Sequence, residues 1–184
     1  MTTANDNTDS DTPTQKEMSD DEKLARFSNA QDTVNKYAMG SMAVGLIPLP
    51  VIDIAALTGT QLKMLQTLAK QYDIEFSKEM VKSLIASLLG GVMPVSAAAS
   101  LASMMKFIPV IGQASGMFSM ATMGSAGTYA VGTVFIEHFE SGGTFLNFEP
   151  EKVKEKFKAV FDEGKIFVAK LKEGNSKHEN QAPA

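Results

Sequence analysis

The sequence contains no cysteine and only one arginine, Arg26, among its 184 residues. Without cysteine the chain can form neither disulfide bonds nor thiolate metal sites. Without clustered basic residues it lacks the surface that tracks nucleic-acid phosphates. His138 has only His178 as a second histidine, so a catalytic triad or a conventional three-ligand zinc site lacks its partners. We therefore expect no enzyme activity, no cofactor or metal, and no bound nucleic acid.

Charge is scarce in the middle of the chain. Residues 83–136 make up 54 positions with one charged residue, Lys106. The uncharged stretches 83–105 and 112–136 hold 23 and 25 residues, and a helix of about 20 residues crosses the hydrocarbon layer. Pro94 and many glycine and serine residues weaken the first stretch without excluding it, because membrane helices tolerate them when neighbours satisfy the backbone. We predict a hydrophobic helical hairpin over residues 83–136 that inserts into a membrane.

A water-soluble helical bundle is the alternative to a membrane hairpin. In that case the small residues pack into a tight core, and insertion takes place only under some conditions. The mean hydropathy of the chain, −0.03, permits this arrangement. Helix length separates the two alternatives, because unbroken helices near 20 residues favour spanning and pieces of about 10 to 14, ended at Pro94 and Pro109, favour a core.

Both ends of the chain are polar. Residues 1–22 contain seven acidic residues against one base, Lys16, with no apolar run behind a basic start. This composition buries too little apolar surface to fold, and it does not resemble a secretory signal. We expect a disordered acidic tail over 1–19, a single helical domain over 20–173 and a disordered tail over 174–184, with the chain starting in the cytoplasm.

Apolar residues elsewhere recur at three- and four-residue steps, which is typical of amphipathic helices. Ser19 and Glu22 have the spacing of a capping box, and Pro150 suits the first turn of the last helix. The expected helices cover residues 20–38, residues 51–72, a stretch after an N-cap at Ser77, and residues 150–172. No strand pair with turn residues is apparent, so we predict an all-α helical bundle.

Two polar positions stand out in apolar surroundings. Asp53 lies in an uncharged block, where it either caps the start of its own helix or contacts another buried helix. His138 lies between Glu137 and Glu140, and at most two of these three side chains share a helix face. We interpret this group as a helix end at the membrane surface rather than a metal site.

Two other pairs are candidates for helix contacts. Gly112 and Gly116 have the four-residue spacing that lets membrane helices approach closely. Phe157 and Phe161 lie on one face of the amphipathic helix at 150–172. That face either covers the protein's own core or docks into the groove of a partner, and the spacing fits both.

Several motifs together resemble a bacterial protein family. They are Leu-Ile-Pro-Leu-Pro-Val-Ile-Asp at 46–53, Gln-Leu-Lys-Met at 61–64, Ser-Leu-Leu-Gly-Gly at 87–91, Ile-Pro-Val-Ile-Gly at 108–112, and His-Phe-Glu-Ser-Gly-Gly at 138–143. Over about residues 24–170 the chain is similar to the family called domain of unknown function 697. The resemblance implies a membrane-linked accessory role, because the family includes membrane-associated proteins of the YcjF kind and domains fused behind an Era-like GTPase. This chain lacks the Gly-x-x-x-x-Gly-Lys-Ser/Thr phosphate loop, so any GTPase would be a separate chain.

These observations predict a non-catalytic membrane-associated module that anchors, or cooperates with, a cytoplasmic partner such as a GTPase. Lysines flank the predicted hairpin on both sides, and Lys106 alone lies at its turn, so the positive-inside tendency places both flanks in the cytoplasm. We expect the cytoplasmic face of a bacterial inner membrane, with membrane lipid, a separate GTPase and a second copy of the chain as partners. The alternative is a water-soluble helical bundle that acts as a protein-interaction module.

Overall fold

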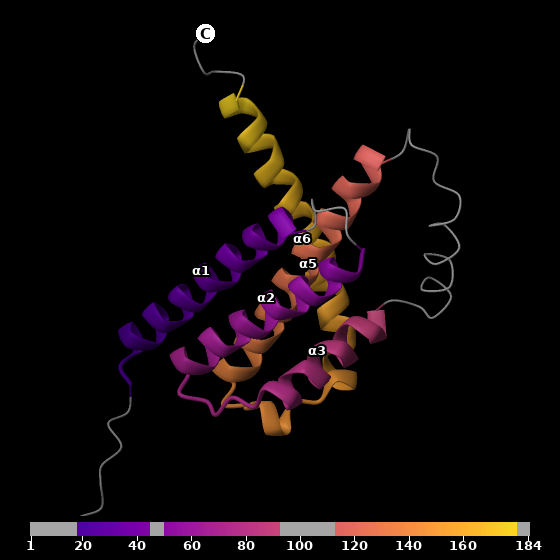
Figure 1. Ribbon diagram of the computed structural model, residues 1–184. Helices are drawn as coiled ribbons and strands as arrows, with labels where there is room; N and C mark the ends of the chain where they lie inside the picture. The colour runs from indigo at the N-terminus through magenta and orange to yellow at the C-terminus, as the bar shows by residue number, and fades with distance from the viewer. Residues whose placement is uncertain (1–17, 45–49, 93–112, 180–184) are drawn as a thin grey trace, which may run out of the picture.

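The computed structural model describes residues 18–44, 50–92 and 113–179 of the protein (Figure 1). Within these ranges the chain forms five α-helices, one short 3-10 helix and no strand. The helices are α1 (Asp20–Val44), α2 (Pro50–Gln71), α3 (Lys78–Val92), α5 (Gln113–Glu140) and α6 (Pro150–Glu179), with the 3-10 helix η2 (Phe145–Asn147) before α6. The predicted all-α fold is confirmed for the described part of the chain.

The helix starts follow the local signals in the sequence. The backbone N–H of Ser19 donates to Glu22 Oε2 at 2.8 Å, and the N–H of Glu22 donates to Ser19 Oγ at 3.3 Å, which is the predicted capping box. Pro150 is the first residue of α6, where its missing N–H costs no helical hydrogen bond. The helix ends depart further from the prediction than the starts do. α1 continues beyond the predicted residue 38 to Val44, and α6 continues beyond the predicted residue 172 to Glu179.

The helices pack as an antiparallel bundle with α5 at its centre (Figure 1). α5 lies between α1 and α6 and also contacts α2 and α3. Its last residue, Glu140, reaches Arg26 near the start of α1, whereas Ser125 lies beside Ala38 further along α1. α6 also packs on α3, and its last turns extend beyond the other helices at the top of Figure 1.

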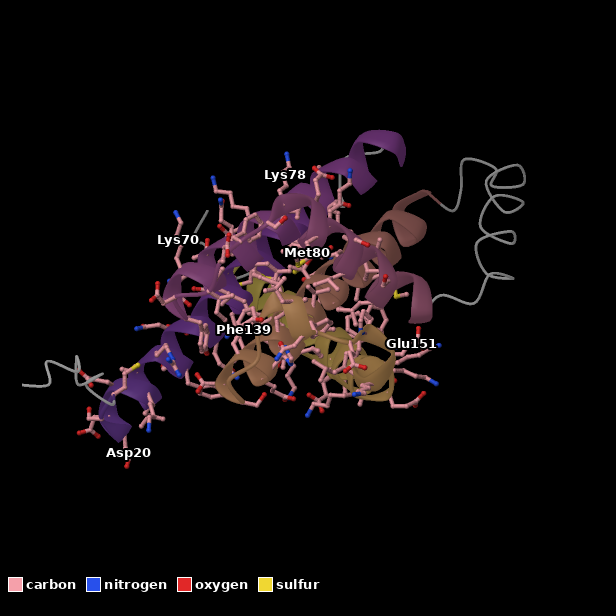
Figure 2. All side chains as sticks on the ribbon, turned by 90° about the horizontal axis from the view of Figure 1, so that it is seen from below. Asp20, Lys70, Lys78, Met80, Phe139 and Glu151 are labelled. Atoms are coloured by element: carbon pink, nitrogen blue, oxygen red, sulfur yellow. The ribbon has the colours of Figure 1, made fainter. Side chains whose placement is uncertain are left out.

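Aromatic side chains of the apolar core gather where α5 meets η2 and Phe148. The rings of Phe135 and Phe148 stack with centroids 4.2 Å apart, and Phe139 meets Phe145 edge-on at 5.2 Å. Figure 2 shows Phe139 inside the bundle, with charged side chains projecting from its surface. Other helices contribute fully buried side chains to the same core: Val34, Met64, Leu65, Leu68, Val81, Ile85 and Phe157.

α1 meets its neighbours through buried polar side chains as well. Ser41 Oγ and Thr128 Oγ1 lie 3.0 Å apart, and Gln61 Nε2 donates to Thr128 Oγ1 at 3.4 Å. Ser125 Oγ donates to the carbonyl of Ala38 at 2.5 Å. Hydrogen bonds therefore fix how α5 sits against α1 and α2, in addition to apolar packing.

Two glycines allow close contact between helices. A Cβ on Gly132 of α5 would lie 2.8 Å from Cγ1 of Val34 on α1, and nearer still to Cγ2. A Cβ on Gly164 of α6 would lie 3.0 Å from the carbonyl oxygen of Ala126 on α5. On each side of α5, the packing of the neighbouring helix thus requires one residue without a side chain.

The predicted membrane-spanning helices are not supported in the described ranges, where no helix combines the length and the apolar composition that a membrane crossing requires. α3 has 15 residues, which is about 22 Å of helix. α5 has 28 residues, but serine, threonine and glycine recur along it and dilute its apolar character. Residues 93–112, the centre of the predicted hairpin, lie outside the described residues.

Candidate functional site

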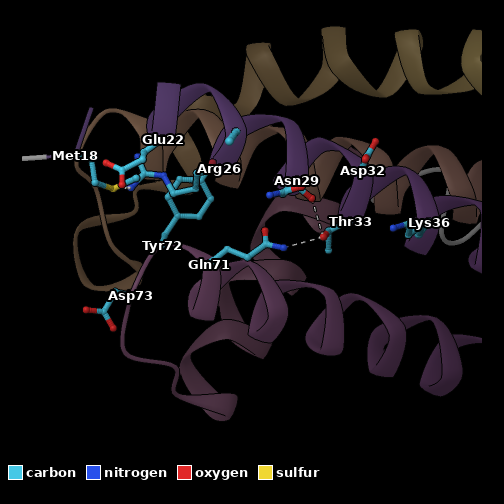
Figure 3. Close-up of a pocket in the computed structure, with 11 residues that line it drawn as sticks. Met18, Glu22, Arg26, Asn29, Asp32, Thr33, Lys36, Gln71, Tyr72 and Asp73 are labelled. Atoms are coloured by element: carbon cyan, nitrogen blue, oxygen red, sulfur yellow. Dashed lines mark hydrogen bonds between the residues drawn. The ribbon is translucent and has the colours of Figure 1, made fainter. Parts of the chain in front are cut away.

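An open groove of about 590 Å³ lies between α1 and the end of α2 (Figure 3). Its walls carry charged and polar side chains, among them Arg26, Thr33 and Lys36 from α1 and Gln71 and Tyr72 from the end of α2. Gln71 Nε2 donates to Thr33 Oγ1 at 3.0 Å and links the two walls. Because this groove concentrates polar groups around a hollow, we take it as the candidate site.

Two residues that line the groove, Arg26 and Tyr72, form a cluster with Glu140 at the end of α5. Arg26 Nη2 pairs with Glu140 Oε2 at 3.3 Å, and the guanidinium carbon lies 4.6 Å from the centroid of the Tyr72 ring. The hydroxyl of Tyr72 donates to Glu140 Oε1 at 2.6 Å. Burial, reinforced by this bond to a carboxylate, raises the pKa of Tyr72. The cluster therefore joins α1, α5 and the end of α2, with a neutral tyrosine in contact with both members of an ion pair.

Two polar atoms on the groove wall have no hydrogen-bond partner within the described residues. They are Arg26 Nε, a donor, and Gln71 Oε1, an acceptor, and both atoms are buried. Buried atoms of this kind are usually satisfied by an ordered water. The lining of the groove offers side chains of both charge signs and hydrogen-bonding groups, which are suited to binding a polar molecule.

The predicted group around His138 is a helix end. Gly142 has φ +81°, its N–H donates to the carbonyl of Phe139 at 2.9 Å, and the N–H of Gly143 donates to the carbonyl of His138 at 2.9 Å. This pattern is the Schellman motif, which needs glycine at the left-handed position. His138 Nε2 lies 3.0 Å from the carbonyl oxygen of Thr144 and 3.0 Å from Asn147 Oδ1. Because both neighbours are acceptors, we assign the proton to Nε2, which donates to them.

The two glutamates beside His138 bind different partners. Glu137 Oε1 pairs with Lys156 Nζ on α6 at 3.0 Å, whereas Glu140 binds Arg26 and Tyr72. The residues that the structure describes contain no group of three or more histidine, aspartate and glutamate side chains that could hold a metal ion. The His-Phe-Glu-Ser-Gly-Gly motif thus ends α5 and connects it to α1 through Glu140, and Glu137 just before the motif connects α5 to α6.

The other predicted site residues are placed as follows. Asp53 lies in the first turn of α2, and its side chain is outside the described part. Gly116 belongs to the first turns of α5, and Gly112 lies outside the described residues, so the close approach predicted for this pair stays a prediction. Phe157 is fully buried and Phe161 is 9% exposed, and both belong to the core. Of the two alternatives for that face of α6, burial supports packing on the protein's own core.

The cluster of Arg26, Tyr72 and Glu140 was not predicted from the sequence. The only available signal was that Arg26 is the single arginine of a chain that otherwise uses lysine. Arginine is preferred over lysine where one side chain must pair with a carboxylate and also lie on an aromatic ring, as Arg26 does here.

Comparison with known proteins gives one family and one curated relative. The model of the family described as a domain of unknown function (DUF697) matches residues 12–165. Magnetosome membrane protein 22 of Magnetospirillum gryphiswaldense is 36% identical over 152 residues, which cover 82% of this chain and 78% of that protein. No solved structure matches the chain.

Proposed function

Because this chain belongs to the family described as domain of unknown function 697, we propose that it is a non-catalytic, membrane-associated helical module of a bacterium. The observation that carries the proposal is the similarity to Magnetosome membrane protein 22, whose name places that protein in a membrane. The similarity covers most of both chains, so it involves the bundle as a whole and not an appended segment.

We place the module at the cytoplasmic face of the inner membrane, with membrane lipid as its partner. Lys70 and Lys78 project from the bundle surface in Figure 2, and lysines in such positions are typical of cytoplasmic segments next to a membrane. The residues that line the groove between α1 and α2 can bind a ligand. This lining fits membrane anchoring better than catalysis.

Fractionation of a bacterium that expresses the full chain tests the proposal. The protein should sediment with the membranes, and detergent should release it. Washing with alkaline carbonate then separates an inserted protein, which stays in the pellet, from one held at the surface by charge. Recovery of monodisperse protein from the cytosolic fraction without detergent would contradict membrane association.

A second candidate function is cooperation with a separate GTPase. It is supported by the resemblance to domains fused behind GTPases and by an exposed surface on α6, where Ile166 is 59% exposed and the last turns extend beyond the bundle. Ile166→Asp should then weaken capture of a GTPase in a crosslinked pull-down. Leu146→Asp, at a site 79% exposed on η2, is the matched control and should capture it normally. A wild-type pull-down that contains no GTPase would remove this candidate.

A further inference from the structure

α1 is joined to its neighbours by a row of polar side chains. The row follows one face of the helix at four- and seven-residue steps, and its members are Arg26, Thr33, Tyr37 and Ser41. Each of them contacts a polar side chain of α2 or α5, and these partners are Glu140, Gln71, Thr67 and Thr128 respectively. Another hydrogen bond runs from Ser125 Oγ to the carbonyl of Ala38. We call this set of contacts the polar seam of α1.

The apolar residues that α1 adds to the core are small. Among the largest fully buried side chains of the described residues, only Val34 belongs to α1, and its other buried apolar residues are Ala30 and Ala38. Its two aromatic side chains pack on the core but are only partly buried. α3 and α6, by contrast, bury bulky side chains such as Ile85 and Phe157. Apolar burial therefore holds α1 less strongly than it holds these two helices.

The polar seam also contains buried atoms without a hydrogen-bond partner. In the described ranges these side-chain atoms are Arg26 Nε, Gln61 Oε1 and Gln71 Oε1. Arg26 and Gln71 belong to the seam, and Gln61 donates to the Thr128 hydroxyl that lies beside Ser41. A buried polar atom that no protein group satisfies costs free energy, which contact with bulk water recovers. Opening of the seam gives each of these atoms that contact.

Water already reaches the seam from one side. The groove between α1 and the end of α2 is lined by Arg26 and Thr33, and the side chains of Arg26 and Glu140 are 23% and 27% exposed. A hydrogen bond that breaks beside water is replaced by a bond to water, whereas a lost apolar contact has no such replacement. The polar seam is thus the side of the bundle whose opening is best compensated by water.

Displacement of α1 would uncover an uncharged part of α5. α5 has no charged residue before Glu137, and α1 covers it where Val34 meets Gly132 and where Ala38 meets Ser125. In the closed bundle, the large apolar side chains that the described residues expose are spread over separate elements: Met18, Leu24, Met39, Met123, Leu146 and Ile166. An uncharged helix face is suited to lipid, because charged groups are costly within a bilayer.

The hydroxyl groups on this face of α5 do not prevent contact with lipid. Thr128 Oγ1 donates to the carbonyl of Gly124, four residues earlier in the same helix, at 3.0 Å. Serine and threonine side chains in membrane helices are satisfied by backbone carbonyls in this way. The threonine therefore keeps a hydrogen bond when α1 is displaced.

Resting on the membrane association proposed above, we propose that α1 is a detachable cover. It opens along the polar seam as one helix, while α2, α3, α5 and α6 stay packed on one another. Membrane phospholipid then takes the place of α1 on α5. Without a membrane, the ion pair of Arg26 with Glu140 and the hydrogen bonds of the seam return α1 to its position.

The absence of cysteine allows α1 to be locked in place by a single disulfide. A Cβ on Gly132 would lie 2.8 Å from Cγ1 of Val34, so cysteines at these two positions are within disulfide reach. In the oxidised Val34→Cys/Gly132→Cys variant of the full chain, α1 cannot leave α5. We expect this form to lose co-flotation with vesicles of phosphatidylethanolamine and phosphatidylglycerol, and reduction with dithiothreitol should restore it.

A second disulfide is the matched control, because it joins α5 to α6 and leaves α1 free. A Cβ on Gly164 would lie 3.1 Å from Cα of Ala126. The Ala126→Cys/Gly164→Cys variant should float with the vesicles in both its oxidised and its reduced form. Circular dichroism of every form checks that the helices remain folded.

Hydrogen exchange of the wild-type chain tests the opening without any substitution. Backbone amides of α1 should exchange faster than those of α3 and α5, and vesicles should increase the exchange of α1 further. Exchange of α1 only at the rate of the whole bundle would overturn the inference.

Flotation separates failure of this inference from failure of the proposed function. Co-flotation of the oxidised Val34→Cys/Gly132→Cys protein at the wild-type level would overturn the inference and leave membrane association standing. Absence of co-flotation for the wild-type chain would overturn both. Disulfides between two chains in place of one would show that α1 of a second copy, and not lipid, takes the position on α5, which would also overturn the inference.

Discussion

Tyr72 connects three helices. Its hydroxyl donates to Glu140 of α5, Arg26 of α1 lies over its ring, and its backbone N–H donates to the carbonyl of Leu68 in α2. Burial and the Glu140 carboxylate both favour the neutral phenol and raise the pKa of Tyr72 above its ordinary value of 10.0. Folding is therefore coupled to the protonation of this tyrosine.

We expect the free energy of unfolding to fall less steeply with rising alkaline pH in Tyr72→Phe than in the wild type. Because the folded pKa is raised, the stabilisation is complete below about pH 10 and is lost as the pH rises above it, with a slope of at most about 1.4 kcal/mol per pH unit. Urea unfolding at pH 8 and at pH 10.5 measures the slope for the wild type and the variant. Tyr129→Phe removes a different phenol and serves as the control, and equal slopes for wild type and Tyr72→Phe would contradict the assignment.

Gly132→Ala tests the close approach of α5 to α1. The added Cβ would overlap Val34, whose branched side chain has little rotational freedom in a helix, so we expect a loss of about 1 to 3 kcal/mol. Gly59→Ala is the control, because no atom lies within 4 Å of its Cβ position in α2 and alanine favours helix by about 0.5 to 1 kcal/mol. Chemical denaturation should show a lower free energy of unfolding for Gly132→Ala and a higher one for Gly59→Ala. A stabilised Gly132→Ala would show that the helices can move apart.

At the scale of elements, the turn after α5 depends on two glycines for different reasons. Gly142 supplies the left-handed backbone, whereas Gly143 makes room for the His138 ring. A Cβ on Gly143 would lie 2.6 Å from Cδ2 of that ring. The ring would have to leave Thr144 and Asn147, which it now bonds.

Gly143→Ala should therefore destabilise the protein through His138. We expect a loss of about 1 to 3 kcal/mol in the wild type and a much smaller loss when His138 is already alanine. A double-mutant cycle by thermal or urea unfolding measures this coupling. Additive losses would mean that the glycine matters for its backbone and not for the ring.

The buried face of α6 gives a second test at this scale. Phe157→Ala should cost about 3 to 5 kcal/mol, because its side chain is 0% exposed and its removal leaves a cavity. Ile166→Ala, on the exposed face of the same helix, should change the free energy of unfolding by less than about 0.5 kcal/mol. A folded Phe157→Ala protein of normal stability would return this face to the docking alternative.

The elements that could be predicted from the sequence are those with local signals. The capping box of Ser19 with Glu22 and the start of α6 at Pro150 depend on neighbouring residues, and both are observed. The end of α1 was placed at residue 38, since charge and amphipathic spacing fade there, yet the helix continues to Val44. Ser41 explains part of the extension, because it lies 3.0 Å from Thr128 on α5, and such a contact has no local signature.

The site was harder to predict for the same reason. Arg26 and Glu140 are 114 residues apart in the sequence, and Tyr72 and Glu140 are 68 apart. The spanning hairpin was predicted because the hydropathy of a segment reflects its lack of charged residues. It does not show whether other parts of the protein bury that segment. In α5 the uncharged side chains Ala126, Ala130 and Val131 are buried within the bundle.

At the scale of the molecule, the N-terminal helix closes the bundle against an element far along the chain. α1 contacts α2, but its more extensive packing is on α5, with Ser41 and Thr128 separated by 87 residues. Closure over such distances makes folding slow compared with bundles whose helices pack only on sequence neighbours. α1 cannot reach its final position until α5 is available.

This connectivity sets an order of events during synthesis. When the ribosome has made residues up to Val92, about 48 more residues must be added before Glu140 exists to hold Arg26. At about 5 to 20 residues per second this interval lasts roughly 2 to 10 s. Throughout it, the faces of α2 and α3 that later cover α5 have no partner of their own to bury them. A chaperone or a nearby membrane surface thus has several seconds to engage the nascent chain before the chain can bury those faces itself.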